Sequence, residues 1–253
     1  MTFKFSKYQL NQAVFCLAFF GQFFLFFANP NIFTVLASFV CLHYLSNILH
    51  IASHNGASKN RFLNKIIGWL TCVWVFVFTF ADFCLTHKEH HKFQGDKEKD
   101  PDYKIIAGGN VFLLPFRIVL VKDATFWNYN KMRFEYLFQR FCQIITVVSA
   151  FIFFRENFIY NWILPLLLVG ICNALFLYFL PHYTNSLFEK LIQRSKFFAY
   201  LTQIARVSHD LHHQKVTNNL VYYPEFWVQK TGYQNIAEVI VKLDKLQNTL
   251  NKT

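Results

Sequence analysis

Glycine and acidic residues are scarce in this sequence, which has 8 glycines and 14 aspartates and glutamates among 253 residues, against 25 lysines and arginines. Its six cysteines lie in or beside apolar runs and follow no pairing pattern, so neither a disulfide framework nor a cysteine-ligated zinc site is predicted. There is no low-complexity tract and no whole-chain repeat. Lys4 and Lys7 precede an apolar stretch, but no small-residue cleavage site follows it. We therefore predict a retained anchor rather than a signal peptide.

Long apolar runs, in contrast, are abundant. The composition is 54% hydrophobic and 20% aromatic, with 33 phenylalanines, which is more apolar material than a soluble core of this length needs. Residues 13–28, for example, contain a single polar side chain, Gln22. A helix of about 20 apolar residues crosses the hydrocarbon core of a bilayer. We therefore predict four membrane-spanning helices, at about residues 12–29, 32–50, 137–154 and 158–181.

The formal net charge of +11 raises the question of nucleic-acid binding, but the placement of the charges argues against it. Among the lysines and arginines, only Arg155 falls in a segment predicted to lie outside the cytoplasm. The others lie at the N-terminus, between residues 59 and 140, or after His182. This asymmetry follows the positive-inside rule, so both termini are predicted to be cytoplasmic. The same charges would attract anionic lipid head groups or an acidic electron carrier.

Two further apolar runs are not predicted to span the membrane. Residues 110–121 are interrupted by Pro115 and Arg117, so this run is too short and is predicted to be interfacial. A crossing helix at residues 66–85 would place the histidines before and after it on opposite faces, about 30 Å apart. We therefore predict that this segment is interfacial or re-entrant. The predicted fold is a single all-α integral-membrane domain, residues 1–253, with four transmembrane helices, this interfacial or re-entrant helix and a cytoplasmic helical cap.

Eight of the ten histidines fall into three clusters. His50 and His54 form H-x-x-x-H, residues 87–91 read H-K-E-H-H, and residues 209–213 read H-D-L-H-H. Positions i, i+3 and i+4 share one face of a helix, so each cluster can direct two or three imidazoles to one place. Imidazole is a favoured ligand of iron, zinc and copper, and eight histidines suit two ions better than one.

His182, at the end of the last predicted span, is expected to be a ninth ligand. The predicted metal ligands are His50, His54, His87, His90, His91, His182, His209, His212 and His213. No catalytic residue beyond these ligands and no other cofactor-binding residue is predicted. His43, two turns before His50, is predicted to be a hydrogen-bonded helix residue instead.

Other metal chemistries fit the pattern less well. The zinc-protease motif H-E-x-x-H is absent, because the second cluster reads H-K-E-H-H. A metal transporter would hold its ligands in mid-membrane along a path, whereas these clusters lie at the ends of predicted spans. A histidine-rich metal transporter thus fits less well than an enzyme, and it remains the non-enzyme alternative.

At these clusters the sequence resembles the membrane fatty acid desaturase superfamily, which has three histidine boxes, and within it the bacterial and cyanobacterial-type β-carotene hydroxylases. The resemblance is carried by HIASHN at residues 50–55, HKEHHKFQGDKEKDPD at residues 87–102 and FLPH at residues 179–182. Ile51, where carotenoid enzymes usually carry Asp, and QKVTNNLVYYPEFW after the third box depart from that branch.

The resemblance implies two non-haem irons on the three boxes, O2 as co-substrate, and hydroxylation of a carotenoid in a bacterial inner or thylakoid-type membrane. No flavin, nicotinamide or iron–sulfur motif is present, so electrons must come from a partner, which the resemblance implies is ferredoxin-like or a cytochrome. A fatty acyl desaturase, a lipid hydroxylase and a carotenoid ketolase are alternatives on the same metal core. Asp100 and Asp102 are open to two interpretations: they orient ligand histidines, or they form a solvated turn.

Overall fold

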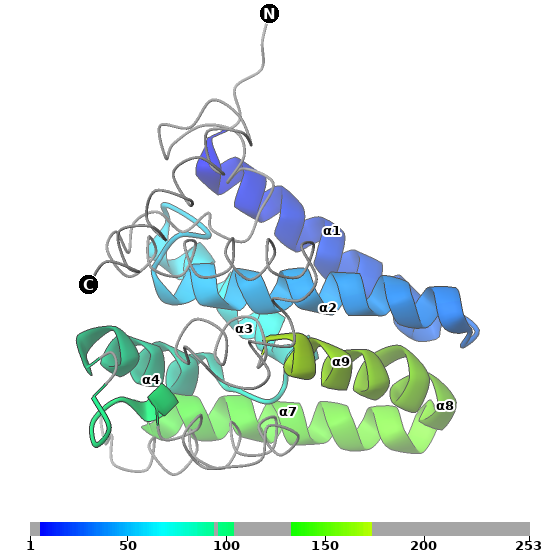
Figure 1. The fold of residues 1–253 in the computed structure, drawn as a ribbon. Coiled ribbons are helices and arrows are strands. Elements are labelled where there is room, and N and C mark those ends of the chain that lie inside the picture. The colour runs from blue at the N-terminus through cyan, green and yellow to red at the C-terminus, as the bar shows by residue number, and fades with distance from the viewer. Residues whose placement is uncertain (1–5, 94–95, 104–132, 174–253) are drawn as a thin grey trace, which may run out of the picture. The chain divides into compact units, whose positions relative to one another are not determined.

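The computed structural model describes residues 6–93, 96–103 and 133–173, whose helices are shown in Figure 1. Within these residues the chain is helical and has no strand, as predicted. The elements are α1 (Lys7–Phe27), α2 (Ile32–Ser53), α3 (Arg61–Trp74), α4 (Phe80–Phe93), α7 (Arg133–Phe153), α8 (Arg155–Asn157), the π-helix η3 (Phe158–Ile163) and α9 (Leu164–Asn173). The predicted interfacial segment at residues 110–121 and the predicted C-terminal cap lie outside the described residues.

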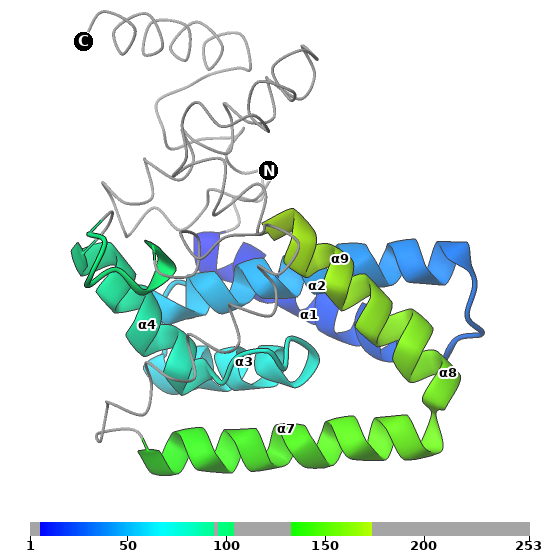
Figure 2. The same cartoon turned by 60° about the horizontal axis from the view of Figure 1, so that its bottom comes forward.

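Helices α1 and α2 form a hairpin, and Figures 1 and 2 both show them side by side. They approach closely at Gly21, where a Cβ atom would lie 3.1 Å from Sγ of Cys41. Gln22, the polar side chain of the first apolar run, is fully buried and donates from Nε2 to the carbonyl of Asn161 (2.9 Å). The amide NH2 group of this side chain thus finds its acceptor on a neighbouring helix.

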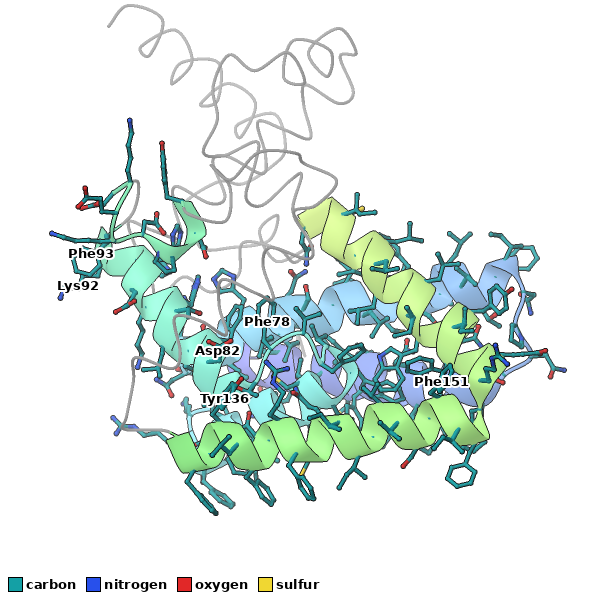
Figure 3. All side chains as sticks on the ribbon, turned by 90° about the horizontal axis from the view of Figure 1, so that it is seen from below. Phe78, Asp82, Lys92, Phe93, Tyr136 and Phe151 are labelled. Atoms are coloured by element: carbon teal, nitrogen blue, oxygen red, sulfur yellow. The ribbon has the colours of Figure 1, made fainter. Side chains whose placement is uncertain are left out.

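Three described helices are long and apolar enough to cross a membrane: Tyr8–Phe27, Ile32–Ser53 and Phe134–Phe153. They overlap three of the four predicted spans. The fourth, at residues 158–181, is described only as far as Asn173 and there consists of η3 followed by α9, so it stays a prediction. Large apolar side chains are exposed along α7, and Figure 3 shows a row of side chains that project away from the other helices. Such a continuous apolar face is typical of a membrane-contacting surface.

The apolar run at residues 66–85 does not form one continuous helix. Helix α3 ends at Trp74 and α4 begins at Phe80, with a short turn between them. Three side chains on α7 hydrogen-bond the backbone around this turn. The contacts are Gln143 Nε2 to the carbonyls of Cys72 (2.9 Å) and Phe78 (2.7 Å), Arg140 Nη1 to the carbonyl of Phe76 (3.0 Å), and Gln139 Oε1 to the N–H of Phe80 (2.7 Å). Non-helical backbone at membrane depth requires such protein partners. The interfacial or re-entrant position of the segment stays a prediction.

Helix α3 is fixed against α4 and α7. A Cβ atom at Gly68 would overlap the ring of Phe80, so the close approach of α3 to the start of α4 requires glycine. Lys65 and Trp69, on either side of Gly68, both donate to the carboxylate of Glu135 on α7, at 2.7 and 2.9 Å. These contacts set the position at which α4 begins, and hence the position of the histidines at its other end.

Candidate metal centre

The first histidine box lies at the end of α2. His50 is in the last turn of the helix, and His54 is its C-cap residue. Asn55 follows with a φ of 56°, a left-handed conformation that ends helices and that asparagine adopts more readily than most residues. The N–H of Gly56 then bonds the carbonyl of Ile51 (2.9 Å). The turn therefore ends the helix directly after the two imidazoles.

The loop after His54 is held by Asn64 of α3, a residue that sequence reasoning did not single out. Its Oδ1 accepts the N–H of Ala57 (3.0 Å), and its Nδ2 donates to the carbonyl of Ala52 (2.8 Å). Asn11 of α1 donates to the carbonyl of Gly56 (3.0 Å) in the same loop. Both asparagines are buried. The signal that would have found Asn64 is its position on the buried face of α3, where a polar side chain needs a specific partner.

Helix α4 brings the second box to the first. The candidate ligand nitrogens of His50, His54, His87 and His91 all lie within 4.8 Å of one another. Nε2 of His87 is central, at 2.9 Å from Nε2 of His54 and 3.1 Å from Nε2 of both His50 and His91. Nitrogen ligands about 2.1 Å from one ion would be about 3.0–3.4 Å apart. The four imidazoles therefore fit the donor set of one metal ion.

Burial keeps imidazoles of this cluster in the neutral form. Burial, and then the neighbouring His50 and His54, lower the pKa of His87 well below its usual value. Burial, and then His90, lower the pKa of His91 to about 4. A metal ion binds the neutral imidazole, so at neutral pH it need not displace a proton from these two residues. Phe83 stacks on the ring of His87, with centroids 5.3 Å apart and an interplanar angle of 18°, and so restricts its orientation.

These lowered pKa values predict how the stability of the metal-free protein depends on pH. An unfolded histidine titrates near pH 6.5, whereas His87 and His91 titrate lower in the folded protein. The unfolded state therefore binds more protons below about pH 6.5, and the free energy of unfolding should fall as the pH drops from there towards 4. The thermal midpoint in detergent, measured from about pH 7.5 to 4.5, checks this. His91→Gln should flatten the dependence, and identical curves for the two proteins would contradict the assignment.

His90, the middle histidine of the second box, is not part of the four-histidine cluster. Its side chain is 1% exposed, and Nδ1 lies 2.9 Å from Oδ1 of Asp100 and 3.5 Å from Oδ2 of Asp102. Both aspartates are buried, so the interpretation of this segment as a solvated turn is wrong at these two positions. The carboxylates contact a predicted ligand instead, as the other interpretation requires.

Five of the nine predicted ligands lie within the described residues. Four form the cluster, and His90 lies beside it, with its ring centroid 5.9 Å from that of His91. The others, His182, His209, His212 and His213, lie outside the described residues, and their role stays a prediction. His43 contacts Nδ2 of Asn47 through its Nε2 (3.3 Å) and takes no part in the cluster, in agreement with its predicted role as a hydrogen-bonded helix residue.

Comparison with known proteins agrees with this geometry. The sequence model of the fatty acid desaturase family matches residues 25–236, most of the chain and all three histidine boxes. The protein therefore belongs to the fatty acid desaturase family. Searches of curated proteins and of solved structures gave no match. Family membership and the histidine cluster together fit a metal-dependent oxidoreductase of the membrane with a lipophilic substrate.

Proposed function

We propose that the protein is a non-haem di-iron membrane oxygenase that hydroxylates a carotenoid, using O2 and electrons from a partner. The cluster of His50, His54, His87 and His91 carries this proposal, because four imidazoles converging at the ends of two helices are a suitable donor set for iron. Membership of the fatty acid desaturase family supports it. Iron held there would supply the activation of O2 and the oxidation of a substrate C–H bond.

The remaining histidines would complete two ligand sets. His90 contributes from α4, and the residues proposed to join it are His182, His209, His212 and His213. In the reaction, the substrate C–H bond, O2, two electrons and two protons give an alcohol and water. The electrons would come from a ferredoxin-like protein or a cytochrome, which the basic residues on the proposed cytoplasmic side would attract.

The same cluster supports the proposed membrane topology. His50 precedes α3 and His87 lies in α4, which follows α3, yet their Nε2 atoms are 3.1 Å apart. This short distance supports the proposal that both boxes lie on one side of the membrane and that α3 and α4 together return to the side from which they start. The positive-inside rule favours the cytoplasmic side for the boxes and both termini, in a bacterial inner or thylakoid-type membrane.

The carotenoid substrate is supported by the sequence around the first two boxes, at residues 50–55 and 87–102. Ile51 favours the second candidate, a fatty acyl desaturase or lipid hydroxylase, because carotenoid enzymes usually carry Asp at this position. A carotenoid ketolase is the third reaction that this site would support. The metal transporter is disfavoured, because the cluster lies at helix ends rather than along a path through the membrane.

The test is expression in bacteria engineered to accumulate β-carotene, with a ferredoxin and its reductase supplied. Pigments and acyl chains are then analysed by chromatography and mass spectrometry. Hydroxylated carotenoid in cells with the wild-type chain, and none in cells with His90→Ala, is the expected result. Keto products would identify a ketolase, and an altered acyl profile with unchanged pigment would identify the second candidate. Unchanged pigments and acyl chains despite a loaded metal site would overturn all three.

A further inference from the structure

The second histidine box divides its side chains between two environments. His87 and His91, one helical turn apart, face His50 and His54. His90 lies between them in the sequence of α4, but its Nδ1 atom faces the carboxylates of Asp100 and Asp102. Its side chain is almost fully buried, so this orientation is set by protein contacts and not by solvent.

The segment that supplies these carboxylates is held in a turn by hydrogen bonds between its own residues. Oδ1 of Asp96 accepts the N–H groups of Glu98 (2.9 Å) and Lys99 (3.1 Å), and the N–H of Asp100 bonds the carbonyl of Asp96 (3.0 Å). Oδ1 of Asp100 accepts the N–H of Asp102 (2.8 Å) while it contacts His90. The turn therefore presents both carboxylates to the same imidazole nitrogen without requiring any rearrangement.

This contact determines which nitrogen of His90 can bind a metal. An ionised carboxylate only accepts hydrogen bonds, so Nδ1 of His90 carries the proton and donates it to Asp100. Nε2 is then the nitrogen with a lone pair for a metal ion. Because His90 does not join the four-histidine cluster, its Nε2 would serve a different ion from the one that His50, His54, His87 and His91 would hold.

The contact also supplies negative charge. Every predicted ligand is an imidazole, and neutral imidazoles leave the positive charge of bound ions uncompensated in a partly buried site. Asp100 and Asp102 are 1% and 2% exposed, and they place carboxylate oxygens directly behind His90. Carboxylates in this position raise the basicity of a ligand histidine and tune the ion that it binds.

We propose that Asp100 and Asp102 are positioning residues that act through His90, fixing Nε2 toward a second metal ion and lowering the reduction potential of that ion. This inference rests on the proposed di-iron function. Asp100, at 2.9 Å, makes the stronger contact and Asp102, at 3.5 Å, the weaker one. The effect of removing each charge should follow the same order.

Asp100→Asn tests the proposal because the amide oxygen can still accept the Nδ1–H of His90 while the charge is lost. The purified full-length protein is loaded with iron in detergent, and the iron content and midpoint potentials are measured. In Asp100→Asn, one of the two ions should show a higher midpoint potential and an affinity about 10- to 100-fold lower. Glu98→Gln is the matched control, since it makes the equivalent change at an exposed carboxylate of the same turn and should alter neither quantity.

Asp102→Asn provides a second variant with a smaller expected rise in potential, which keeps the test decisive if Asp100→Asn folds poorly. Unchanged potential and affinity in both variants would overturn the proposal and leave the aspartates a purely structural role. Failure of the proposed di-iron site itself is distinguishable, because the wild-type protein would then bind no iron at the histidine boxes. An equal change in Glu98→Gln would also overturn the proposal, since it would show a general effect of surface charge.

Discussion

Replacing His87 by alanine is expected to reduce product formation below detection and to remove about one of the two proposed ions. His87 is the histidine whose Nε2 lies within 3.1 Å of the Nε2 atoms of the other three cluster members. Its removal leaves three imidazoles for the ion. Losing a ligand weakens metal binding more than losing a hydrogen bond to the back of a ligand, which itself lowers metal affinity about 10- to 100-fold. Iron content per chain and product yield are the two measurements.

The matched control for this variant is His43→Gln on α2. His43 is also a histidine of a candidate membrane span, but it contacts Asn47 and lies outside the cluster. Glutamine can retain a hydrogen bond, so iron content and product yield should remain close to those of the wild-type protein. Wild-type iron content in His87→Ala would refute the single-ion geometry of the four-histidine cluster, even if product formation were lost.

Gly68→Ala is expected to destabilise the protein by about 1–3 kcal/mol, because overpacking forces side chains or backbone to move. The added Cβ would overlap three atoms of the Phe80 ring. Phe80 begins α4, and a displaced α4 would carry His87 and His91 away from the first box. The thermal midpoint and the iron content should therefore fall together.

Gly21→Ala is the control for this prediction. It places the same methyl group in another helix contact, but there the nearest atom is Sγ of Cys41 at 3.1 Å, a much milder approach. Both substitutions gain helix propensity, so the difference between them isolates the overlap with Phe80. Phe80→Leu combined with Gly68→Ala should recover part of the lost stability. If Gly68→Ala is no less stable than Gly21→Ala, α3 and α4 do not pack as described.

The sequence predicted the meeting of the first two boxes, because boxes that share a metal site must lie on one face of the membrane, which excludes a single crossing helix at residues 66–85. It did not predict that His90 would face Asp100 and Asp102 instead of the four-histidine cluster. Positions i+3 and i+4 differ by about 100° around a helix, so an H-x-x-H-H box can serve either one ion or two. The choice depends on Asp100, which reaches His90 only after the chain has turned, and local spacing carries no information about that turn.

The break between α3 and α4 could not be located from the sequence either. Residues 75–79 read VFVFT and contain neither glycine nor proline, the residues that usually mark an interruption. The break is stabilised by Gln139, Arg140 and Gln143, which lie more than 50 residues further along the chain. A topological argument predicted that the segment should not cross as one helix, but its end points depend on these distant partners.

The dependence on α7 has a consequence for the order of biosynthesis. Both of the first two boxes have been synthesised once residue 91 is complete, yet the backbone groups of the α3–α4 turn acquire their partners only when Gln139 to Gln143 have entered the membrane. Before that step the turn has unsatisfied carbonyl groups, which are costly in a lipid environment. We therefore expect the nascent chain to hold its first metal-binding cluster firmly in place only after the third candidate span has been inserted.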